Sequence, residues 1–334
     1  MDPHRLRKSP NIAIVGSTSL LGKELREMLE SRGLPMGRLV LLETEEYAGL
    51  LQEFAGEIQI TQVISPDAFE DIDIAFFTCG PEIMQSYVAS GAKFPDLTID
   101  LTQAGREGTV YLHGISDPRL LRTHGYFVNP HAAAIVIGRI LSHLHNMFAV
   151  ESAAVTVLEP ASERGNAGVD ELQEQTVSLL NFQQVEKKIF HGQLAFNILP
   201  EPEASIRTER RILDQLEAIF GKTFPKPVLN VMQAPVFHSH SFSMFLNVYA
   251  HTDELSAHFS EDPAFSIDDT NDATGGGPSP VGVVGSDKIH IERLRNAGQS
   301  RSHSLWVVAD NLRIAASNAI QIAEHIMLAP ALEA

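Results

Sequence analysis

The turn within FVNPHAAAIVIG, residues 127–138, has the form of a reactive site. The stretch reads as the end of a strand, a proline-marked turn and the first turn of an apolar helix. The first backbone N–H groups of a helix are unpaired and its dipole is positive there, so an anion or a thiolate would be stabilised. The first side chains of this helix, however, are three alanines, Ala132 to Ala134. The position suits a nucleophile but carries none.

Two histidines and one cysteine are further candidates for chemistry. His238 and His240 are two residues apart on an expected strand, where they would share one face and could bind a metal. Because no Asp, Glu or Cys with ligand spacing stands near them in the sequence, we predict no metal and expect packed or hydrogen-bonded histidines. Cys79 is expected to be a small buried residue at a strand end. A single cysteine cannot form an intramolecular disulfide, which favours a cytoplasmic location.

A glycine-rich turn, IVGSTSLLG, follows the first expected strand and opens the first helix. Gly16 would make the tight turn and Gly22 would let the helix approach the strand closely, as in a dinucleotide-binding fingerprint. Ser17, Thr18 and Ser19 offer hydroxyl and N–H groups to a phosphate at the helix N-terminus. Ser19 replaces the glycine that would bring the backbone near a pyrophosphate. Cofactor binding and a purely structural turn both remain open.

The end of the second expected strand bears on the choice between NAD and NADP. A 2′-phosphate would need an arginine here, but LLETEEYAGL offers only Glu43, Glu45 and Glu46. Either one of these acids accepts a hydrogen bond from a ribose 2′-OH, which favours NAD, or the three form a solvated loop face.

The order of expected elements predicts the fold. Short apolar strands alternate with amphipathic helices over the first hundred residues, which is typical of a doubly wound, Rossmann-type parallel sheet. Longer strands with alternating apolar and polar residues follow, with helices near 169–181 and 203–220. This pattern of elements predicts an α+β domain with a mixed, largely antiparallel sheet. We expect a long loop over the acidic, Gly/Pro-rich residues 261–280. The predicted domains are 1–131 with 312–334, which contains the candidate dinucleotide-binding turn, and 132–311.

Composition excludes several classes of protein. A chain of 334 residues with a formal charge of −17 is poorly suited to nucleic acid, which needs clustered Lys and Arg. No stretch approaches the roughly 20 apolar residues of a membrane span. The basic N-terminal residues lead into an ordinary strand, so we expect no signal peptide.

Taken in order, six stretches resemble the aspartate-semialdehyde dehydrogenase family from Asn11 to about Met327. They are GSTSLLG, TCGP, VNPHAAA, EPASERGNAGVDEL, APVFHSHS and LWVVADNLRIAASNAIQIAE. The resemblance implies a homodimer, with NAD(P) bound by the first domain (1–131 with 312–334) and dimerisation and substrate binding by the second (132–311). The reaction it implies is the reversible, NADP-dependent reductive dephosphorylation of aspartyl phosphate in amino-acid biosynthesis. It also implies a cysteine nucleophile after Asn-Pro-X, a histidine acid/base, and a glutamine and an arginine that position the acyl enzyme and the substrate carboxylate.

The resemblance places the reactive positions residue by residue. Ala132 stands for the nucleophile, Glu159 for the glutamine and Gln233 for the substrate arginine. His240 keeps the acid/base position and Arg106 the phosphate-binding arginine. Alanine cannot form a thioester, and an amide cannot give a carboxylate the bidentate charged contact of a guanidinium.

The remaining matches concern the turn and the cofactor. Asn129 keeps the asparagine of the nucleophile turn, and Cys79 with Gly80 lies in the loop on the cofactor side. Asn311 begins the cofactor helix in the family pattern, although a helix N-cap is an alternative role for it.

The resemblance is to the cysteine-less branch, similar to Usg protein homologues. We therefore predict a catalytically silent homodimer that binds NAD or NADP, with NAD favoured and the small-molecule substrate unknown. Two alternatives remain: a protein-interaction scaffold that keeps only the dimer, and an oxidoreductase with residual or non-covalent chemistry. In the latter, His240 and Glu159 would form an acid/base pair, provided that one water can bridge them.

Overall fold

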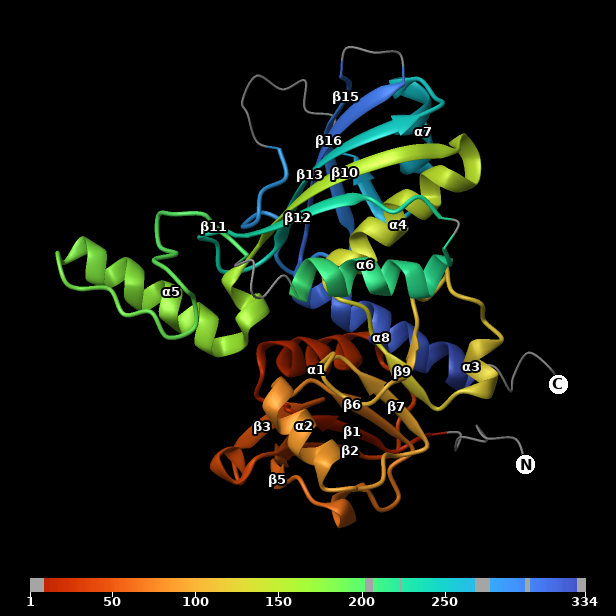
Figure 1. Ribbon diagram of the computed structural model, residues 1–334. Coiled ribbons are helices and arrows are strands. Elements are labelled where there is room, and N and C mark those ends of the chain that lie inside the picture. Colours follow the sequence, from red (N-terminus) through yellow and green to blue (C-terminus); the bar gives the residue numbers. More distant parts are fainter. Residues whose placement is uncertain (1–8, 202–206, 223, 268–276, 298–300, 329–334) are drawn as a thin grey trace. The chain divides into compact units, whose positions relative to one another are not determined.

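The computed structural model describes residues 9–201, 207–222, 224–267, 277–297 and 301–328 (Figure 1). Clustering of contacts divides the chain into two compact units, 1–131 with 315–334 and 132–314. Each unit contains its own seven-stranded sheet. The predicted fold class, a Rossmann-type sheet followed by a mixed sheet, is confirmed.

The first unit is built on a parallel sheet with the strand order β5-β2-β1-β6-β7-β9-β8. The strands are β1 (Ile12–Val15), β2 (Leu39–Glu43), β5 (Gln62–Val63), β6 (Ile74–Phe77), β7 (Leu97–Asp100), β8 (Thr109–Val110) and β9 (Tyr126–Val128). Its helices are α1 (Leu20–Arg32), α2 (Pro81–Ala89) and the short α3 (Leu120–Thr123), with 3₁₀ turns η1 (Glu45–Tyr47) and η2 (Pro66–Phe69). A separate hairpin pairs β3 (Leu51–Phe54) with β4 (Glu57–Ile60).

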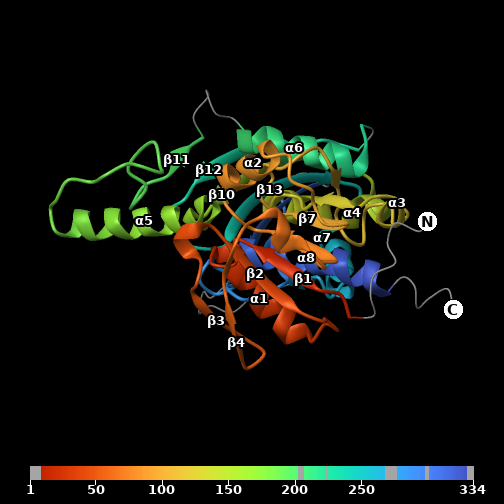
Figure 2. The same ribbon diagram turned by 90° about the horizontal axis from the view of Figure 1, so that it is seen from below.

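Both faces of this sheet are buried, because successive side chains of a strand point to opposite sides. Ile12 and Ile14 of β1 pack with residues of α1 and with the part of α8 (Asn311–Leu328) that follows Ala315. Ala13 and Val15 pack on the other face with residues of α2. Figure 2 shows α1 and α2 on opposite sides of β1 and β2.

The second unit is built on a mixed sheet with the order β11-β12-β10-β13-β16-β15-β14. The strands are β10 (Val150–Glu159), β11 (Leu199–Pro200), β12 (Val228–Gln233), β13 (His240–Val248), β14 (Phe265–Ile267), β15 (Ile289–Asn296) and β16 (Ser302–Ala309). The helices are α4 (Ala132–Phe148), α5 (Gly165–Leu180), α6 (Arg207–Phe220) and α7 (Thr252–Glu261), with the 3₁₀ turn η3 (Ala161–Arg164). Strand β10 runs parallel to β12 and antiparallel to β13.

The two faces of the second sheet differ in their cover. Helix α4 packs against β10 and β13, where Val155, Val157, Phe242 and Met244 are buried. Helix α5 instead extends away from the sheet of its unit in both ribbon views (Figures 1 and 2). The apolar residues of α5 join a small separate cluster with Phe190, Leu194 and Leu199.

Two expectations about local structure were wrong in part. Residues 261–280 are not a continuous loop, because Phe265–Ile267 forms β14 and pairs in parallel with β15. The apolar Phe265 supplies a buried strand residue inside the acidic stretch, and residues 268–276 lie outside the described residues. Helix α5 begins at Gly165, four residues before the expected start at 169, directly after η3.

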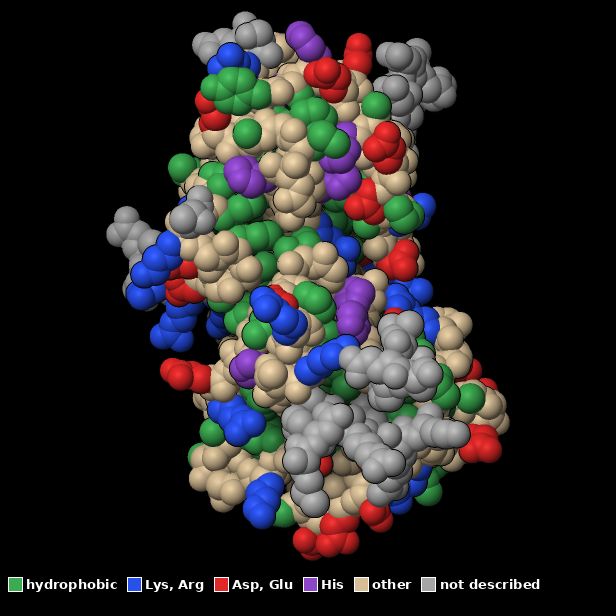
Figure 3. All heavy atoms as spheres, turned by 90° about the vertical axis from the view of Figure 1, so that its right-hand side faces the viewer, with side chains coloured by type: hydrophobic (Ala, Val, Ile, Leu, Met, Phe, Trp, Pro, Cys, Tyr) green, Lys and Arg blue, Asp and Glu red, His purple; other side chains and the backbone are tan. Residues whose placement is uncertain are grey.

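No helix of the described residues has both the length and the apolar character needed to cross a bilayer. Figure 3 shows Lys and Arg side chains interspersed with Asp, Glu and His over one face of the described residues.

Candidate functional site

The position that the resemblance assigns to the nucleophile begins α4. Ala132 is the first residue of this 17-residue helix and only 5% of its surface is exposed. Its neighbours Ala133 and Ala134 are also buried. The helix begins where the sequence predicts, but its first residues provide only methyl groups.

Glu159 and Gln233 contact each other directly. They are the last residues of β10 and β12, which run in parallel register, so their side chains emerge at the same edge of the sheet. Both are buried, and Gln233 Nε2 donates a hydrogen bond to Glu159 Oε2. Arg164 Nη2 lies 3.6 Å from the same carboxylate oxygen. The two positions that depart from the family pattern therefore form one complementary pair.

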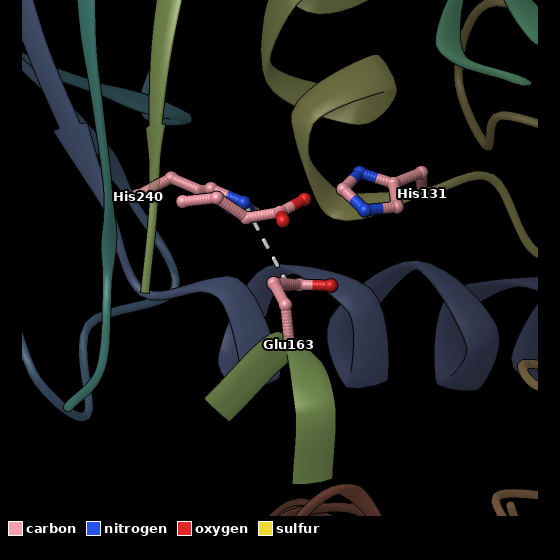
Figure 4. Close-up of side chains that lie close together, drawn as sticks. His131, Glu163 and His240 are labelled. Atoms are coloured by element: carbon pink, nitrogen blue, oxygen red, sulfur yellow. Dashed lines mark ion pairs between the residues drawn. The ribbon is translucent and has the colours of Figure 1, made fainter. Parts of the chain in front are cut away.

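His240 lies next to a second carboxylate, that of Glu163. His240 is the first residue of β13 and is fully buried, and its Nε2 lies 3.7 Å from Glu163 Oε1 (Figure 4). Potential ligand atoms of Glu159, Glu163 and His240 lie within 4.8 Å of one another. One water can bridge groups at this distance, so the acid/base pair of His240 and Glu159 meets its geometric condition. His131, also labelled in Figure 4, is the last residue of the first unit and directly precedes Ala132 in the chain.

The expectation that His238 and His240 share a strand face was wrong. Strand β13 begins only at His240, and His238 lies in a bend before it. Ser239 between them has φ +73°, a left-handed conformation that breaks the two-residue alternation. The absence of nearby acids in the sequence was also a poor guide, because η3 brings Glu163 to His240 from a distant segment.

Asn311 does not cap α8, and the alternative role predicted for it was wrong. The carboxylate of Asp310 accepts hydrogen bonds from the N–H groups of Leu312 and Arg313 at 3.0 and 3.1 Å. Asn311 instead donates from Nδ2 to Glu163 Oε1 at 2.8 Å and accepts from the N–H of Ser239 at 3.0 Å. Its side chain therefore fixes Glu163 relative to the turn before β13.

In the first unit, the glycine-rich turn depends on close backbone approach. Gly16 has φ +85°, and a Cβ there would lie 2.5 Å from backbone atoms of Cys79. A Cβ at Gly22 would lie 2.3 Å from the carbonyl oxygen of Gly16. Glycine is required at both positions by sterics alone. These contacts occur with or without a cofactor, so they do not separate the two interpretations of the turn.

The hydroxyl and N–H groups of the turn have partners within the unit. Glu43 Oε1 accepts from the N–H of Thr18 at 2.5 Å and from the hydroxyl of Ser17 at 3.3 Å. Ser19 caps α1 by accepting from the N–H of Gly22 at 2.9 Å. Glu43 is only 3% exposed, so a solvated loop face is wrong for this residue, whereas Glu45 and Glu46 are exposed.

Cys79 is a protonated thiol in a buried position. Only 6% of its surface is exposed, and burial, followed by the nearby Asp100 carboxylate, raises the pKa of the thiol to about 12. Gly80 is the N-cap of α2, where Pro81 takes the first helical position and its missing N–H costs nothing. This loop has the chemistry of a structural turn.

Arg106 and Asn129 also belong to the first unit. The exposed Arg106 places its guanidinium 4.5 Å from the centre of the Tyr126 ring. Asn129 donates to the carbonyl of Ala315 at 3.2 Å and accepts from Asn318 at 2.8 Å, which ties the nucleophile turn to α8. Asn129 therefore has a packing role in the described structure.

Sequence reasoning missed Glu163 and Arg164. The signal was present in EPASER, where Glu163 follows Glu159 by four residues, but the turn that brings both acids together is a tertiary feature.

Comparison with known proteins identifies related families over most of the chain. Residues 11–116 match the model of the semialdehyde dehydrogenase NAD binding domain, and residues 141–314 match that of the semialdehyde dehydrogenase dimerisation domain. An aspartate-semialdehyde dehydrogenase of Rickettsia conorii is 29% identical over 338 residues, with 96% of this chain and 99% of the relative covered. A USG-1 protein homolog of Pseudomonas aeruginosa is 30% identical over 331 residues, with coverages of 95% and 97%.

Solved structures show the same similarity. Aspartate semialdehyde dehydrogenase II of Vibrio cholerae superposes with a TM-score of 0.85 at 26% identity, over 96% of this chain and 99% of the other. A probable aspartate-semialdehyde dehydrogenase of Pseudomonas aeruginosa gives 0.84 at 26% identity, over 95% and 98%.

Proposed function

We propose that this chain, which belongs to the aspartate-semialdehyde dehydrogenase family, is a nucleotide-binding homodimer that does not perform thioester chemistry. The observation that carries this proposal is alanine at position 132, where the family resemblance requires the nucleophilic cysteine. A methyl group cannot attack an acyl phosphate or an aldehyde, so no covalent intermediate forms there.

Cys79 does not take over the lost role. A thiol reacts as its thiolate, and a pKa of about 12 leaves Cys79 protonated at neutral pH. Its burial also denies access to a substrate, because only 6% of the residue is exposed. The chain contains no other cysteine.

The changed pair at the edge of the second sheet favours a different ligand from aspartyl phosphate. Glu159 adds a negative charge where the family pattern has a neutral glutamine, and Gln233 removes a positive one. Arg164 offsets part of this change by lying 3.6 Å from Glu159. A dianionic substrate would still lose its bidentate arginine contact.

The first unit fits the adenosine half of a dinucleotide. The turn of Gly16 and Gly22 opens α1 after the first strand of a parallel sheet, which is where a dinucleotide-binding fold holds the pyrophosphate. Glu43 at the end of β2 faces this turn, and a carboxylate here favours a ribose 2′-OH over a 2′-phosphate. NAD is therefore the preferred cofactor, and when bound it supplies a hydride-accepting nicotinamide.

The second unit fits a homodimer through the open face of its sheet. Ala154 of β10 pairs with Phe245 of β13 on one side and with Val228 of β12 on the other. Phe245 is 54% exposed and Val228 is 71% exposed. A large exposed apolar residue at the centre of a flat sheet is typical of a surface that is covered in an assembly.

The first experiment is calorimetric titration of the purified protein with NAD and then with NADP. We expect binding of NAD in the micromolar range, on the order of −8 kcal/mol, with NADP weaker. The variant Glu43→Gln should reduce the preference for NAD, because it removes the charge that repels a 2′-phosphate. Absence of heat with both nucleotides would reject cofactor binding and favour the scaffold.

The second experiment is an assay for phosphate-dependent oxidation of aspartate semialdehyde with either nucleotide. We expect no turnover above background. A rate above about 1 per second, an ordinary enzyme rate, would contradict the proposal.

A second candidate function has one observation in its favour. His240 lies within 4.8 Å of two carboxylates, which suits acid/base chemistry without a covalent intermediate. Loss of a cofactor-dependent reaction on His240→Gln, with nucleotide binding unchanged, would establish this candidate.

A further inference from the structure

We propose that His240, Glu159 and Glu163 bind a divalent transition-metal ion in the second unit. The three side chains offer one imidazole nitrogen and two carboxylate oxygens, all within 4.8 Å of one another. Ligand atoms around a tetrahedral zinc ion are separated by about 3.3–3.5 Å, as bond lengths near 2.1 Å require. The largest separation must therefore close by at most about 1.5 Å when an ion binds.

The charge balance of the three residues favours a cation. Glu159 is 1% exposed and Glu163 is 16% exposed, so two carboxylates stand close together where water screens them poorly. Arg164 contacts Glu159 from one side at 3.6 Å and supplies one positive charge. A divalent ion between the carboxylates would add positive charge beside both of them.

Both carboxylates are held by side-chain amides of neighbouring residues. Gln233 donates to Glu159 Oε2, and Asn311 donates to Glu163 Oε1 at 2.8 Å. Contacts of this kind orient metal ligands and strengthen binding in known sites. Asn311 is itself fixed by Ser162 and by the N–H of Ser239, so the position of Glu163 is determined in advance.

A second, independent observation points to a ligand here. The amide oxygen of Gln233 is buried and accepts no hydrogen bond from the described residues, although the nitrogen of the same amide binds Glu159. A buried amide oxygen of this kind needs a donor. Water bound to a metal ion at Glu159 would supply one.

The donor types select the class of ion. Imidazole with carboxylates suits Zn²⁺, Mn²⁺, Fe²⁺ or Co²⁺ better than Ca²⁺ or Mg²⁺, which prefer sites made of oxygen alone. Three protein ligands also leave one position for water or an exogenous anion, as in catalytic zinc sites.

The test uses the full-length protein after removal of metal by a chelator and dialysis. A calorimetric titration with Zn²⁺ should show one bound ion per chain, with a dissociation constant at or below about 1 μM. Titration with Co²⁺ should give visible absorption bands of a low-coordinate site.

Two variants locate the ion. Glu163→Gln removes a ligand charge but keeps an oxygen for Asn311. Glu159→Gln removes the other ligand charge but keeps an oxygen that can accept from Gln233. Each should weaken Zn²⁺ binding by at least about 100-fold, more than the 10- to 100-fold loss caused by changes outside the ligands. The matched control is Glu174→Gln, an exposed glutamate of α5, which should bind like the parent protein.

Two outcomes would overturn the proposal. The first is failure of the parent protein to bind a stoichiometric ion. The second is binding of equal strength by the parent protein and both site variants, since a chain with 14 histidines can bind zinc elsewhere. Thermal unfolding in the presence of chelator separates these results from loss of fold, because a folded variant retains a cooperative transition.

Discussion

At the scale of single residues, three positions depart from the pattern that the family resemblance implies, and two of them contact each other. Ala132 stands at the position that the resemblance gives to the nucleophile. Glu159 and Gln233 exchange a neutral amide and a cation for a carboxylate and an amide, and the new pair is hydrogen-bonded across β10 and β12. A buried glutamate without a donor would cost several kcal/mol, and Gln233 with Arg164 supplies donors to Glu159.

Restoring the thiol alone should not restore the enzyme. We expect Ala132→Cys to remain without phosphate-dependent oxidation of aspartate semialdehyde, because Glu159 and Gln233 still oppose the anionic substrate. The triple variant with Glu159→Gln and Gln233→Arg should exceed the single variant in the same spectrophotometric assay. Useful activity from the single change would show that the pocket charge does not decide the outcome.

The thiol of Cys79 should resist modification in the folded protein. Its pKa is raised to about 12, so at pH 8 the folded chain contains almost no thiolate, whereas the unfolded chain ionises near its ordinary value. We expect iodoacetamide to label the chain only in denaturant, with one label per chain by mass spectrometry. Rapid labelling without denaturant would contradict the assignment of Cys79 as a buried structural residue.

At the scale of elements, chain ends and turns position the site. The parallel pairing of β10 with β12 brings Glu159 to Gln233, η3 turns Glu163 toward His240, and Ser239 redirects the chain before β13. Asp310 caps α8, and the side chain of Asn311 contacts Glu163 instead. The site therefore depends on where elements start and end more than on their interiors.

The cap of α8 should contribute measurably to stability. Asp310→Ala removes the acceptor for two N–H groups of the helix and for the N–H of Gly285 at 2.7 Å. We expect a loss of about 1–2 kcal/mol in the free energy of unfolding, measured by urea denaturation. Asp310→Asn, which keeps a capping oxygen, should lose less. Equal stability of Asp310→Ala and the parent chain would show that the cap is dispensable.

At the scale of the whole molecule, the two units differ in the type of their sheets, one parallel and one mixed. The first has both sheet faces covered by helices, whereas on one face of the second sheet the central Phe245 is 54% exposed among the described residues. A two-fold dimer places the same surface of each copy against the other, so one substitution acts twice in the interface.

A charge on the open face should dissociate the dimer. Phe245→Glu would place two buried like charges across the two-fold axis, and we expect sedimentation at the mass of one 36.6 kDa chain. Met147→Glu is the matched control, because Met147 is an equally exposed apolar residue (63%) on α4, which covers the other face. If Phe245→Glu still forms a dimer, the interface does not lie on this face. If the parent protein is a monomer, the homodimer is rejected.

The sequence by itself determined the fold class and showed that position 132 carries no thiol. Alternating apolar patterns are local and fix the strands and helices, and glycine is sterically required at Gly16 and Gly22. The absence of sulfur at Ala132 follows from residue identity alone.

Only the tertiary structure decided which groups meet. Glu163 reaches His240 through a turn between distant segments, Glu43 turns inward to Thr18, and His238 leaves the strand because Ser239 has a positive φ. Residue spacing along a chain predicts a shared face only within one regular element. Contacts between elements depend instead on sheet register, on turn conformation and on which buried groups satisfy one another.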